Sequence, residues 1–413
     1  MSVSSPPQES DVIIAGGGLA GTLLAHALLS LGLRVAMVEV REPRILEQPS
    51  FDGRSTALAN GTVRILDKLG LWSAIEAAAQ PITHIHIGQQ GHFGVARIDA
   101  SEEGVDALGF TAENRLIGEA LWTRLEDRDG FLCLAPARVA AFETDAEGVS
   151  VSVLTDTGES TVRGKLLIAA DGARSTIRQT LGIGTKSGAY GQRAVVANCV
   201  FKRDHRGAAF ERFTRDGPLA LLPLRGKCAL VWSLPEDRAE QVLALSDDEF
   251  ASQLQKAFGN RLGPVTRVGI RASYPLFRMQ SDSVIAERTV LIGNAAVSMH
   301  PVAGQSFNLA VRDIASLAEL IGTVRARDAA GDIGGPQLLA EFSHWRKGDQ
   351  RATAWFTHSL VAGMGLDIPG LGVLRGLALT AFDILPGSKR ALARHTMGLA
   401  GRVPRLARGL DLN

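Results

Sequence analysis

The segment 11–39 limits the folds open to this chain more than any other stretch. An apolar run of strand type leads into three glycines with the spacing G-x-G-x-x-G, at Gly16, Gly18 and Gly21. A run of helical length and composition follows, and a second apolar run ends at Glu39, 18 residues after Gly21. A strand, a glycine turn, a helix, a second strand and an acid in this order predict a βαβ unit that binds a dinucleotide.

Each part of this unit has a physical task at a diphosphate. The glycines allow a tight turn, a close approach of the backbone to the ligand and close packing of helix on sheet. The first N–H groups of the helix and the positive end of its dipole face the diphosphate. The expected contacts are Gly16, Gly18, Leu19, Ala20 and Gly21. Glu39 is expected to bind ribose hydroxyls, and its charge disfavours NADP; the segment does not distinguish FAD from NAD.

Length and charge restrict the class of protein. A chain of 413 residues is long enough for one large domain and a second, or for two interleaved domains. The formal net charge of +1 argues against a nucleic-acid-binding surface over the whole molecule. Three widely spaced cysteines form neither a metal-ligand spacing nor a disulfide framework, which favours a reducing cytoplasm. No metal site is expected, because the nearby histidines His84, His86 and His92 lack partners at ligand spacing.

The two ends of the chain show no pattern of a membrane span. Residues 1–10 are polar and lack a basic region before an apolar core, so we expect a loose leader and not a signal peptide. The apolar stretch 360–385 is interrupted by Asp367, Pro369 and Arg375, and falls short of the roughly 18 uncharged residues of a span. The C-terminal region is helical in pattern, and its basic residues give an amphipathic tail. They are Lys389, Arg390, Arg394, Arg402, Arg405 and Arg408.

A second motif lies in the middle of the chain. The apolar strand K-L-L-I-A-A runs directly into Asp171 and Gly172, and a helix-like segment starts at Thr176. This order places the acid at the carboxyl edge of a parallel sheet, where ligands bind in open α/β folds. The alternative is a plain turn from strand to helix, in which Asp171 only caps the helix.

The same patterns predict the remaining elements. Short runs between 191 and 274 indicate a mostly antiparallel sheet in a second domain, and L-A-L-L-P-L within it is a candidate wall of an apolar tunnel. Arg54 is expected either to lie beside the diphosphate or to form a surface ion pair. The loop from Gly293 to Gly304 precedes a long helix, whose N-terminus would present N–H groups to an anion. Helices are expected over 57–69, 113–125, 245–258 and 305–321, and a β-meander over 131–169.

Three motifs now stand in order along the chain. They are G-G-G-L-A-G, A-A-D-G-A-R-S and L-I-G-N-A-A-V-S-M-H-P-V-A-G-Q-S-F-N-L-A-V-R-D. Together, over most of 12–354, they resemble the group A flavoprotein aromatic hydroxylases, which have the para-hydroxybenzoate hydroxylase fold. The form H-P-x-A-G-Q-x-x-N-L, with Arg54 in an R-S-T-A-L context, is similar to the branch of this family that hydroxylates ubiquinone precursors.

The resemblance implies an α/β fold with an α+β second domain. A Rossmann-like FAD-binding domain would be interleaved with a substrate domain built on an antiparallel sheet, and a helical tail would follow. We expect the FAD-binding domain to comprise 1–80, 101–185 and 285–350, and the substrate domain 81–100 and 186–284. The basic helical region would then be 351–413.

The resemblance also implies roles for the N-terminal and middle motifs. The glycines and Glu39 would hold the ADP half of FAD, and Arg54 and Arg115 would contact the cofactor. Asp171 and Gly172 match the motif that lies near both FAD and the pyridine nucleotide.

The late motif would lie at the reacting end of the cofactor. Members of the family usually carry Gly-Asp there, and we interpret Gly293 and Asn294 in this chain as a mark of the ubiquinone subgroup. His300 with Pro301 is the candidate catalytic pair, and a histidine that only shapes the loop is the alternative. The residues expected beside the isoalloxazine ring are Pro301, Gly304, Gln305 and Asn308.

The implied activity is hydroxylation of the ring of a polyprenylated phenol in ubiquinone biosynthesis. FAD would be the cofactor, NAD(P)H and O2 the co-substrates and a C4a-hydroperoxyflavin the oxidant. The chain lacks a second G-x-G-x-x-G in a strand and helix context, as expected where nicotinamide binds only briefly. The alternatives are a hydroxylase of a small soluble phenol, a reductase of prenyl chains and an FAD-bound subunit of a biosynthetic complex without turnover.

Such a substrate dissolves in membranes. We therefore expect a cytoplasmic protein whose basic tail contacts either the anionic inner-membrane surface or a partner protein of a ubiquinone-biosynthesis complex. The alternative for the tail is a helix that packs on the protein and faces solvent.

Overall fold

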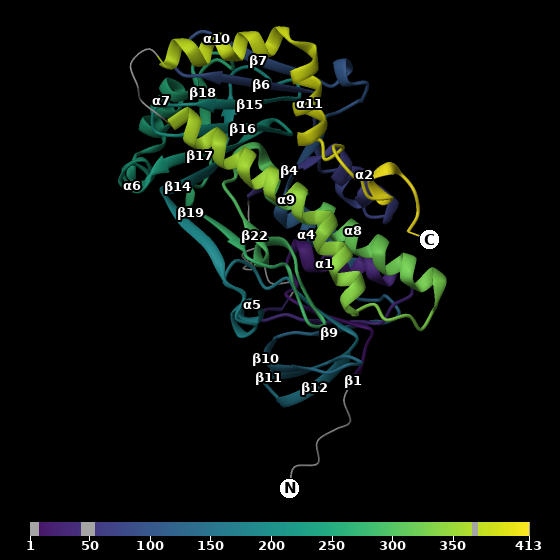
Figure 1. Ribbon diagram of the computed structural model, residues 1–413. Helices are drawn as coiled ribbons and strands as arrows, with labels where there is room; N and C mark the ends of the chain where they lie inside the picture. The colour runs from purple at the N-terminus through teal and green to yellow at the C-terminus, as the bar shows by residue number, and fades with distance from the viewer. Residues whose placement is uncertain (1–7, 43–53, 366–370, 413) are drawn as a thin grey trace.

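The structure is a computed structural model, and it describes residues 8–42, 54–365 and 371–412. Most of the expected leader and the centre of the apolar stretch 360–385 lie outside these residues. Two large sheets dominate the described part, one mostly parallel and one mostly antiparallel, and long helices run beside them (Figure 1). The predicted α/β class and the antiparallel second sheet are confirmed.

The parallel sheet is built around the strand that precedes the glycine turn. Its order is β20-β21-β13-β2-β3-β9, and its neighbours are parallel except β20 and β21. Its strands are β2 (Val12–Ala15), β3 (Val35–Val38), β9 (Phe131–Leu134), β13 (Leu166–Ala169), β20 (Ile285–Ala286) and β21 (Thr289–Leu291). The central strands are short, apolar and fully buried, as is typical of a parallel sheet covered on both faces. Its core is shared with α1 (Leu19–Leu29), α4 (Asn114–Thr123) and α8 (Gln305–Arg327).

Two smaller sheets complete this half of the molecule. One contains β1 (Gln8–Glu9), β12 (Gly158–Gly164), β11 (Val149–Thr155) and β10 (Ala137–Thr144). The other contains β4 (Ser55–Ala59), β8 (Gly109–Glu113) and β5 (Gln80–Ile82). The short helical elements are α2 (Asn60–Lys68), α3 (Trp72–Glu76), η1 (Ser101–Glu103), α5 (Thr176–Thr180), η2 (Gly293–Ala295) and η3 (Val302–Gly304).

Two predictions are wrong in this region. The expected helix over 57–69 begins only with α2, because Ser55–Ala59 pairs with β8 as the strand β4. The expected meander over 131–169 is divided, because β9 joins the parallel sheet. The parallel position of β13, predicted from the strand before Asp171, is confirmed. Between them β10, which the sequence pattern did not indicate, pairs with β11.

The antiparallel sheet has nine strands and two differently used faces. Its order is β22-β19-β14-β17-β16-β15-β6-β7, with β18 paired to β14, and the parallel pair is β15 with β6. Its strands are β6 (His84–Gln89), β7 (Val95–Asp99), β14 (Thr185–Phe201), β15 (Ala208–Phe213), β16 (Pro218–Leu224), β17 (Lys227–Pro235), β18 (Val265–Val268), β19 (Ala272–Ser281) and β22 (Val297–Ser298). One face packs on α6 (Glu236–Ala244) and α7 (Asp247–Phe258) through a core that includes Trp232, Phe250 and Leu254. The prediction of one helix over 245–258 missed α6; Ser246 caps α7 with a capping box and separates the two.

Helices at the C-terminal end connect the two large sheets. The helix α8 packs on α1, and α9 (Pro336–Gly365) packs on α8 and runs on toward the antiparallel sheet (Figure 1). Three further elements follow, α10 (Leu371–Ile384) beside β7, α11 (Pro386–Thr396) and η4 (Leu406–Arg408). The helix predicted over 305–321 continues to Arg327. Within the described ranges, no helix combines the length and apolarity needed to cross a bilayer.

Candidate functional site

The glycine turn after β2 leaves no room for side chains. Gly16 has a φ of +106°, and a Cβ there would lie 2.5 Å from the carbonyl oxygen of Ala170. A Cβ on Gly21 would lie 1.9 Å from the carbonyl oxygen of Gly16, so only glycine fits at both positions. The helix α1 starts here without a side-chain cap, which leaves the N–H groups of its first turn for a ligand. Gly18, Leu19 and Ala20 line one end of a large cavity at this turn.

Glu39 follows β3 and is held against the same turn. Its Oε2 accepts a hydrogen bond from the Gly17 N–H at 2.5 Å, and its Oε1 accepts one from the Arg41 N–H at 3.1 Å. The indole of Trp122 donates to the carbonyl oxygen of Gly17 at 3.2 Å. These contacts fix the acid beside the glycine turn, and its contact with a ribose stays a prediction.

The middle motif lies where β13 ends beside β2. Asp171 Oδ2 accepts from the N–H groups of Thr176 at 2.8 Å and Ile177 at 3.4 Å, so Asp171 does cap α5, as the alternative interpretation held. Its Oδ1, however, is buried with no hydrogen-bond partner in the structure. Gly172 has a φ of +84° and lines the cavity together with Ala173. The capping and ligand-binding interpretations of Asp171 are therefore compatible.

The late motif approaches the N-terminal turn. Gly293 has a φ of +58°, and a Cβ there would lie 3.3 Å from the Cβ of Ala20. Further along the loop, Ala303 and Gly304 also have left-handed backbones, with φ of 60° and 58°. The residues of this motif that line the cavity include Gly293, Asn294, Pro301 and Gly304. The fold thus joins three motifs that are far apart in the sequence.

The two predicted arginines lie in different places. Arg54 lines the cavity, and its guanidinium carbon lies 4.6 Å from the ring centre of Tyr274. Arg115 lies in the first turn of α4, where its side chain is 45% exposed and forms ion pairs with Glu113 at 3.9 Å and Glu119 at 4.0 Å. Arg115 does not line the described part of the cavity, and its contact with the cofactor stays a prediction.

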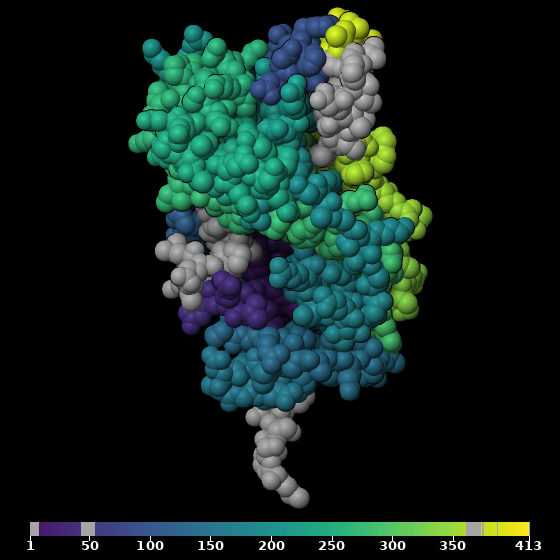
Figure 2. Space-filling model, turned by 90° about the vertical axis from the view of Figure 1, so that its left-hand side faces the viewer, coloured from purple at the N-terminus to yellow at the C-terminus, as the bar shows by residue number. Residues whose placement is uncertain are grey.

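A cavity of about 1000 Å³ connects these motifs with the antiparallel sheet. The volume lies near the upper end of the range for small-molecule sites, which suits a large cofactor and a substrate together. Its far walls are largely apolar and include Ile85, Ile87, Ala194, Val196, Ala220, Leu222 and Val231. Ala220 and Leu222 belong to the predicted wall L-A-L-L-P-L, while the alternate residues Leu219 and Leu221 face the helices behind the sheet. Figure 2 shows a hollow between the green lobe of this sheet and the purple N-terminal segment.

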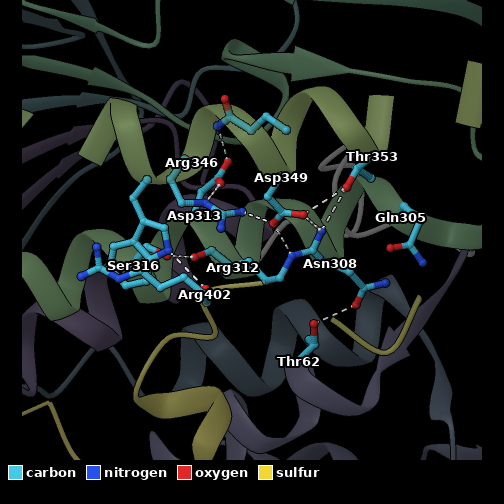
Figure 3. A network of polar contacts seen from close by, with 12 residues as sticks. Thr62, Gln305, Asn308, Arg312, Asp313, Ser316, Arg346, Asp349, Thr353 and Arg402 are labelled. Atoms are coloured by element: carbon cyan, nitrogen blue, oxygen red, sulfur yellow. Dashed lines mark hydrogen bonds and ion pairs between the residues drawn. The ribbon is translucent and has the colours of Figure 1, made fainter. Parts of the chain in front are cut away.

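The predicted residues Gln305 and Asn308 are not among the residues that line the cavity. In Figure 3 the side chain of Asn308 points toward Thr62. Asn308 is 1% exposed and makes four hydrogen bonds of 2.7 to 2.8 Å. Its partners are the backbones of Ala57, Ala59 and Gly304 and the hydroxyl group of Thr62. Gln305 donates to the carbonyl oxygen of Ala303 at 3.0 Å. Both side chains hold the loop in place, and a contact of either with the cofactor stays a prediction; on this helix Ser306, Phe307 and Ala310 line the cavity instead.

Farther along α8, a buried polar network fixes this helix to α9 (Figure 3). Arg346 contacts Asp313 at 2.6 Å and Asp349 at 2.5 Å, and Arg312 contacts Asp349 at 2.8 Å. The side chains of Arg346 and Asp313 are only 2% and 3% exposed. Removing one partner would leave an uncompensated buried charge, so the network holds the two helices in one arrangement.

His300 lies behind the loop and not in the cavity. It is 1% exposed, its Nδ1 accepts from the Val302 N–H at 3.1 Å, and its ring meets Tyr190 edge-on at 5.0 Å. Burial lowers the pKa of His300 to about 4, so the imidazole is neutral at pH 7. These contacts fit the role of shaping the loop, and a catalytic role for His300 stays a prediction.

One polar residue in the apolar wall was missed by sequence reasoning. Glu211 lies on β15 and lines the cavity, and its Oε1 is buried with no hydrogen-bond partner in the structure. Burial raises the pKa of Glu211 to about 7, although the backbone N–H of Ala303 donates to the carboxyl group and opposes the rise. The available signal was the alternation in A-A-F-E-R-F, which places Ala209, Glu211 and Phe213 on one face of the strand.

The residues of the site fit an FAD. The uncapped start of α1 and the glycine turn suit a diphosphate, and the unpaired Oδ1 of Asp171 remains free to accept from a cofactor hydroxyl group. Among the described residues, no three side chains of His, Cys, Asp or Glu gather closely enough to hold a metal ion.

A Rossmann-like unit whose ligand edge opens into an apolar cavity under a second sheet is the architecture of a flavoprotein monooxygenase. Comparison with known proteins agrees with this class. The family model described as FAD binding domain matches residues 9–353. Ubiquinone hydroxylase UbiL of Rhodospirillum rubrum is 38% identical, over 99% of this chain and 95% of its own length. 3-Demethoxyubiquinol 3-hydroxylase of Escherichia coli is 30% identical, over 95% of this chain and 99% of its own.

The chain therefore belongs to the FAD-dependent monooxygenases of the FAD binding domain family, in the branch of the ubiquinone-biosynthesis hydroxylases. The resemblance inferred from the three motifs is confirmed. Among solved structures, p-nitrophenol 4-monooxygenase PnpA of Pseudomonas putida superposes with a TM-score of 0.77. It covers 96% of this chain and 99% of its own at 21% identity, which is a likeness of fold.

Proposed function

We propose that this protein uses FAD, NAD(P)H and O2 to hydroxylate the aromatic ring of a polyprenylated phenol in ubiquinone biosynthesis. One observation carries the proposal: a single cavity runs from the glycine turn to a long apolar wall. A prenylated phenol has an apolar chain and one polar end, and it matches a wall with few polar positions. The names of the two bacterial relatives point to the same class of substrate.

The residues of the N-terminal turn would bind the ADP half of FAD. Bound FAD would supply the redox chemistry, taking electrons from NAD(P)H and activating O2. Gly16 and Gly21 give the diphosphate access to the backbone, and the N-terminus of α1 faces it with positive potential. Glu39 would orient the ribose from beside the turn, and Asp171 would accept from the cofactor through its unpaired oxygen.

The late motif would stabilise the reacting end. Gly293, Asn294 and the loop from Pro301 to Gly304 line the middle of the cavity, and α8 begins directly after that loop. The positive N-terminal end of this 23-residue helix would stabilise negative charge that develops nearby. Because the loop is fixed by Asn308 and His300, this stabilisation needs no rearrangement during the reaction.

The apolar walls of the cavity would exclude water from the site of the reaction. Activated oxygen on a flavin is lost as peroxide when water reaches it, so the site must stay dry. Side chains of the antiparallel sheet line one wall, and Phe356, Leu360 and Leu392 of the C-terminal helices line another. The same walls that accept a prenyl chain would thus protect the reaction.

The test is a comparison of phenols on the purified FAD-loaded protein. Hydroxylated product and NAD(P)H oxidation are measured for a series of phenols with prenyl chains of increasing length. Product formation that rises with chain length is expected, because each added unit buries more apolar surface. A preference for unprenylated phenols would indicate a hydroxylase of soluble phenols, and a flavin that NAD(P)H never reduces would indicate a subunit without turnover.

We further propose that α10 and α11 contact an anionic membrane surface on the cytoplasmic side. Val373, Leu377 and Ile384 on α10 are 50%, 52% and 70% exposed, and Arg390 and Arg394 on α11 are exposed close by in the sequence. An apolar strip beside cations is the pattern of a helix that lies in the membrane interface. A membrane-soluble substrate would then reach the protein without crossing water.

Part of the basic tail forms ion pairs within the protein. Lys389 contacts Glu102 at 2.9 Å, and Arg402 contacts Glu341 at 3.7 Å. Ala393 and Leu406 are fully or almost fully buried, so deletion of the tail would damage the fold. Point variants are therefore the better test of membrane contact.

Cosedimentation with anionic and neutral liposomes provides this test. The double variant Leu377→Ser and Ile384→Ser is expected to bind anionic liposomes more weakly than the parent protein, with FAD content unchanged. Leu410→Ser, at an exposed apolar residue elsewhere, serves as the matched control. Equal binding of the double variant, the control and the parent protein would refute the contact.

A further inference from the structure

We propose that Glu211 binds the hydroxyl group of the substrate phenol and accepts its proton during hydroxylation. This inference rests on the proposed function and assigns a residue to the activation of its substrate. Glu211 is the one carboxylic acid among the described residues that line the cavity. In the sheet it stands opposite Ala220 on β16 and Ile87 on β6, so its carboxyl group lies in an otherwise apolar part of the wall.

The carboxyl group of Glu211 interacts with one backbone N–H group of the protein, but its Oε1 has no hydrogen-bond partner. The backbone N–H of Ala303 donates to it, and Ala303 has a φ of 60°, which is strained for a residue other than glycine. Oε1 is buried without a partner. A buried carboxylate oxygen without a hydrogen bond is costly, and a phenol hydroxyl is a donor that would remove this cost. The loop of the late motif thus positions an acceptor at the cavity wall.

Burial, and not a neighbouring charge, leaves the carboxyl group of Glu211 able to take up a proton. A small pocket that Glu211 also borders is lined by Arg212 on the same strand, Arg261 and His86. Burial lowers the pKa of His86 to about 4, so it is neutral near pH 7. Arg54 lines the same large cavity as Glu211. Burial raises the pKa of Glu211 to about 7, which suits a general base at neutral pH.

Proton transfer would make the ring a better nucleophile. The phenol O–H bond breaks as an O–H bond forms on Glu211, and the electron pair remains on the phenolate oxygen. Electron density rises at the ring carbons ortho and para to that oxygen, and one of them takes the electrophilic oxygen that the flavin and O2 supply. That ring carbon loses its hydrogen as a proton when aromaticity returns, and this proton leaves with the water formed as the cofactor is restored. Glu211 returns its proton to the phenolate oxygen and ends as a carboxylate.

The first experiment compares two phenols of similar size on the holoenzyme. One is neutral at the assay pH, and the other carries halogens that make it already ionised. For the neutral phenol, Glu211→Gln is expected to lower the hydroxylation rate about 100-fold or more, with FAD content unchanged. For the ionised phenol the loss is expected to be less than about tenfold, because no proton must be removed. Glu211→Asp should restore part of the rate, and an equal loss with both phenols would overturn the proposal.

The second experiment needs no turnover. Binding of a phenol and of its methyl ether is followed through the flavin absorbance. The parent protein is expected to prefer the phenol about tenfold or more, and Glu211→Ala to lose the preference, because the ether cannot donate to a carboxylate. If the parent protein hydroxylates no phenol, the proposed function fails, while this binding preference still decides the role of Glu211. Equal binding of both ligands by the parent protein would refute the assignment.

Discussion

Replacement of Glu211 by glutamine should stabilise the protein at alkaline pH, although it removes the proposed base. Burial raises the pKa of Glu211 from its ordinary value of 4.5 to about 7. The folded protein therefore binds this proton more tightly than the unfolded chain. The stability linked to the carboxyl group is complete below the unfolded pKa and is lost as the pH rises through the folded pKa.

The size of this effect follows from the pKa shift. Each pKa unit corresponds to about 1.4 kcal/mol, so the rise from 4.5 to about 7 means that the ionised carboxyl group costs at most about 3.5 kcal/mol of folding free energy well above pH 7. The neutral amide of glutamine avoids this cost. A residue that destabilises the fold when ionised is expected where function requires it.

The measurement is urea unfolding at pH 5 and pH 8 for the parent protein and Glu211→Gln. Between these pH values the variant should gain up to about 3 kcal/mol relative to the parent. Glu240→Gln, at an exposed position on α6, is the matched control and should follow the parent. Parallel pH dependence of Glu211→Gln and the parent protein would refute the assignment of a buried, destabilising carboxyl group.

Three further results are expected. Gly21→Ala should abolish FAD binding, because the added Cβ would clash with the carbonyl oxygen of Gly16; the readout is the flavin absorbance of the purified protein. Gly348→Ala, where the added Cβ meets open space, is the control and should retain FAD. Arg346→Met should lower the free energy of unfolding by about 3–5 kcal/mol, because buried Asp313 loses its cation and Asp349 keeps only Arg312. Exposed Arg351→Met should change it by less than about 0.5 kcal/mol in the same urea titration. The hydroxylation rate of the parent protein should rise with pH through about 7 as Glu211 loses its proton, and a rate profile of Glu211→Gln with the same inflection would contradict this origin.

The parts of the fold that sequence patterns predicted depend on local signals. The turn around Gly16 requires glycine for steric reasons, and the G-x-G-x-x-G spacing makes this visible in the sequence. The helix after the late motif is visible because its apolar residues recur with the helical period over a long stretch. The sequence pattern places 57–59 of β4 in a helix, because A-L-A has no local preference for a strand. Its pairing with β8, whose residues lie 50 to 58 positions later in the chain, decides its conformation.

Sequence patterns could not predict which side chains of the site face the cavity, because the direction of a side chain is set by the fold. Arg115 pairs with two glutamates on the surface, and Asn308 is satisfied by four hydrogen bonds within the protein. Glu211 could be recognised only once the face of β15 that lines the cavity was known. Likewise Lys389 belongs to a basic tail in the sequence but pairs with Glu102 in the fold.

The most direct test of the proposed hydroxylation uses isotopically heavy O2. The FAD-loaded protein is incubated with NAD(P)H, heavy O2 and a polyprenylated phenol, and the product is analysed by mass spectrometry. One heavy oxygen atom is expected on a ring carbon, in an amount that follows the NAD(P)H consumed and disappears when FAD is removed. Consumption of NAD(P)H that yields only hydrogen peroxide, with no labelled ring from any phenol, would contradict the proposed hydroxylation.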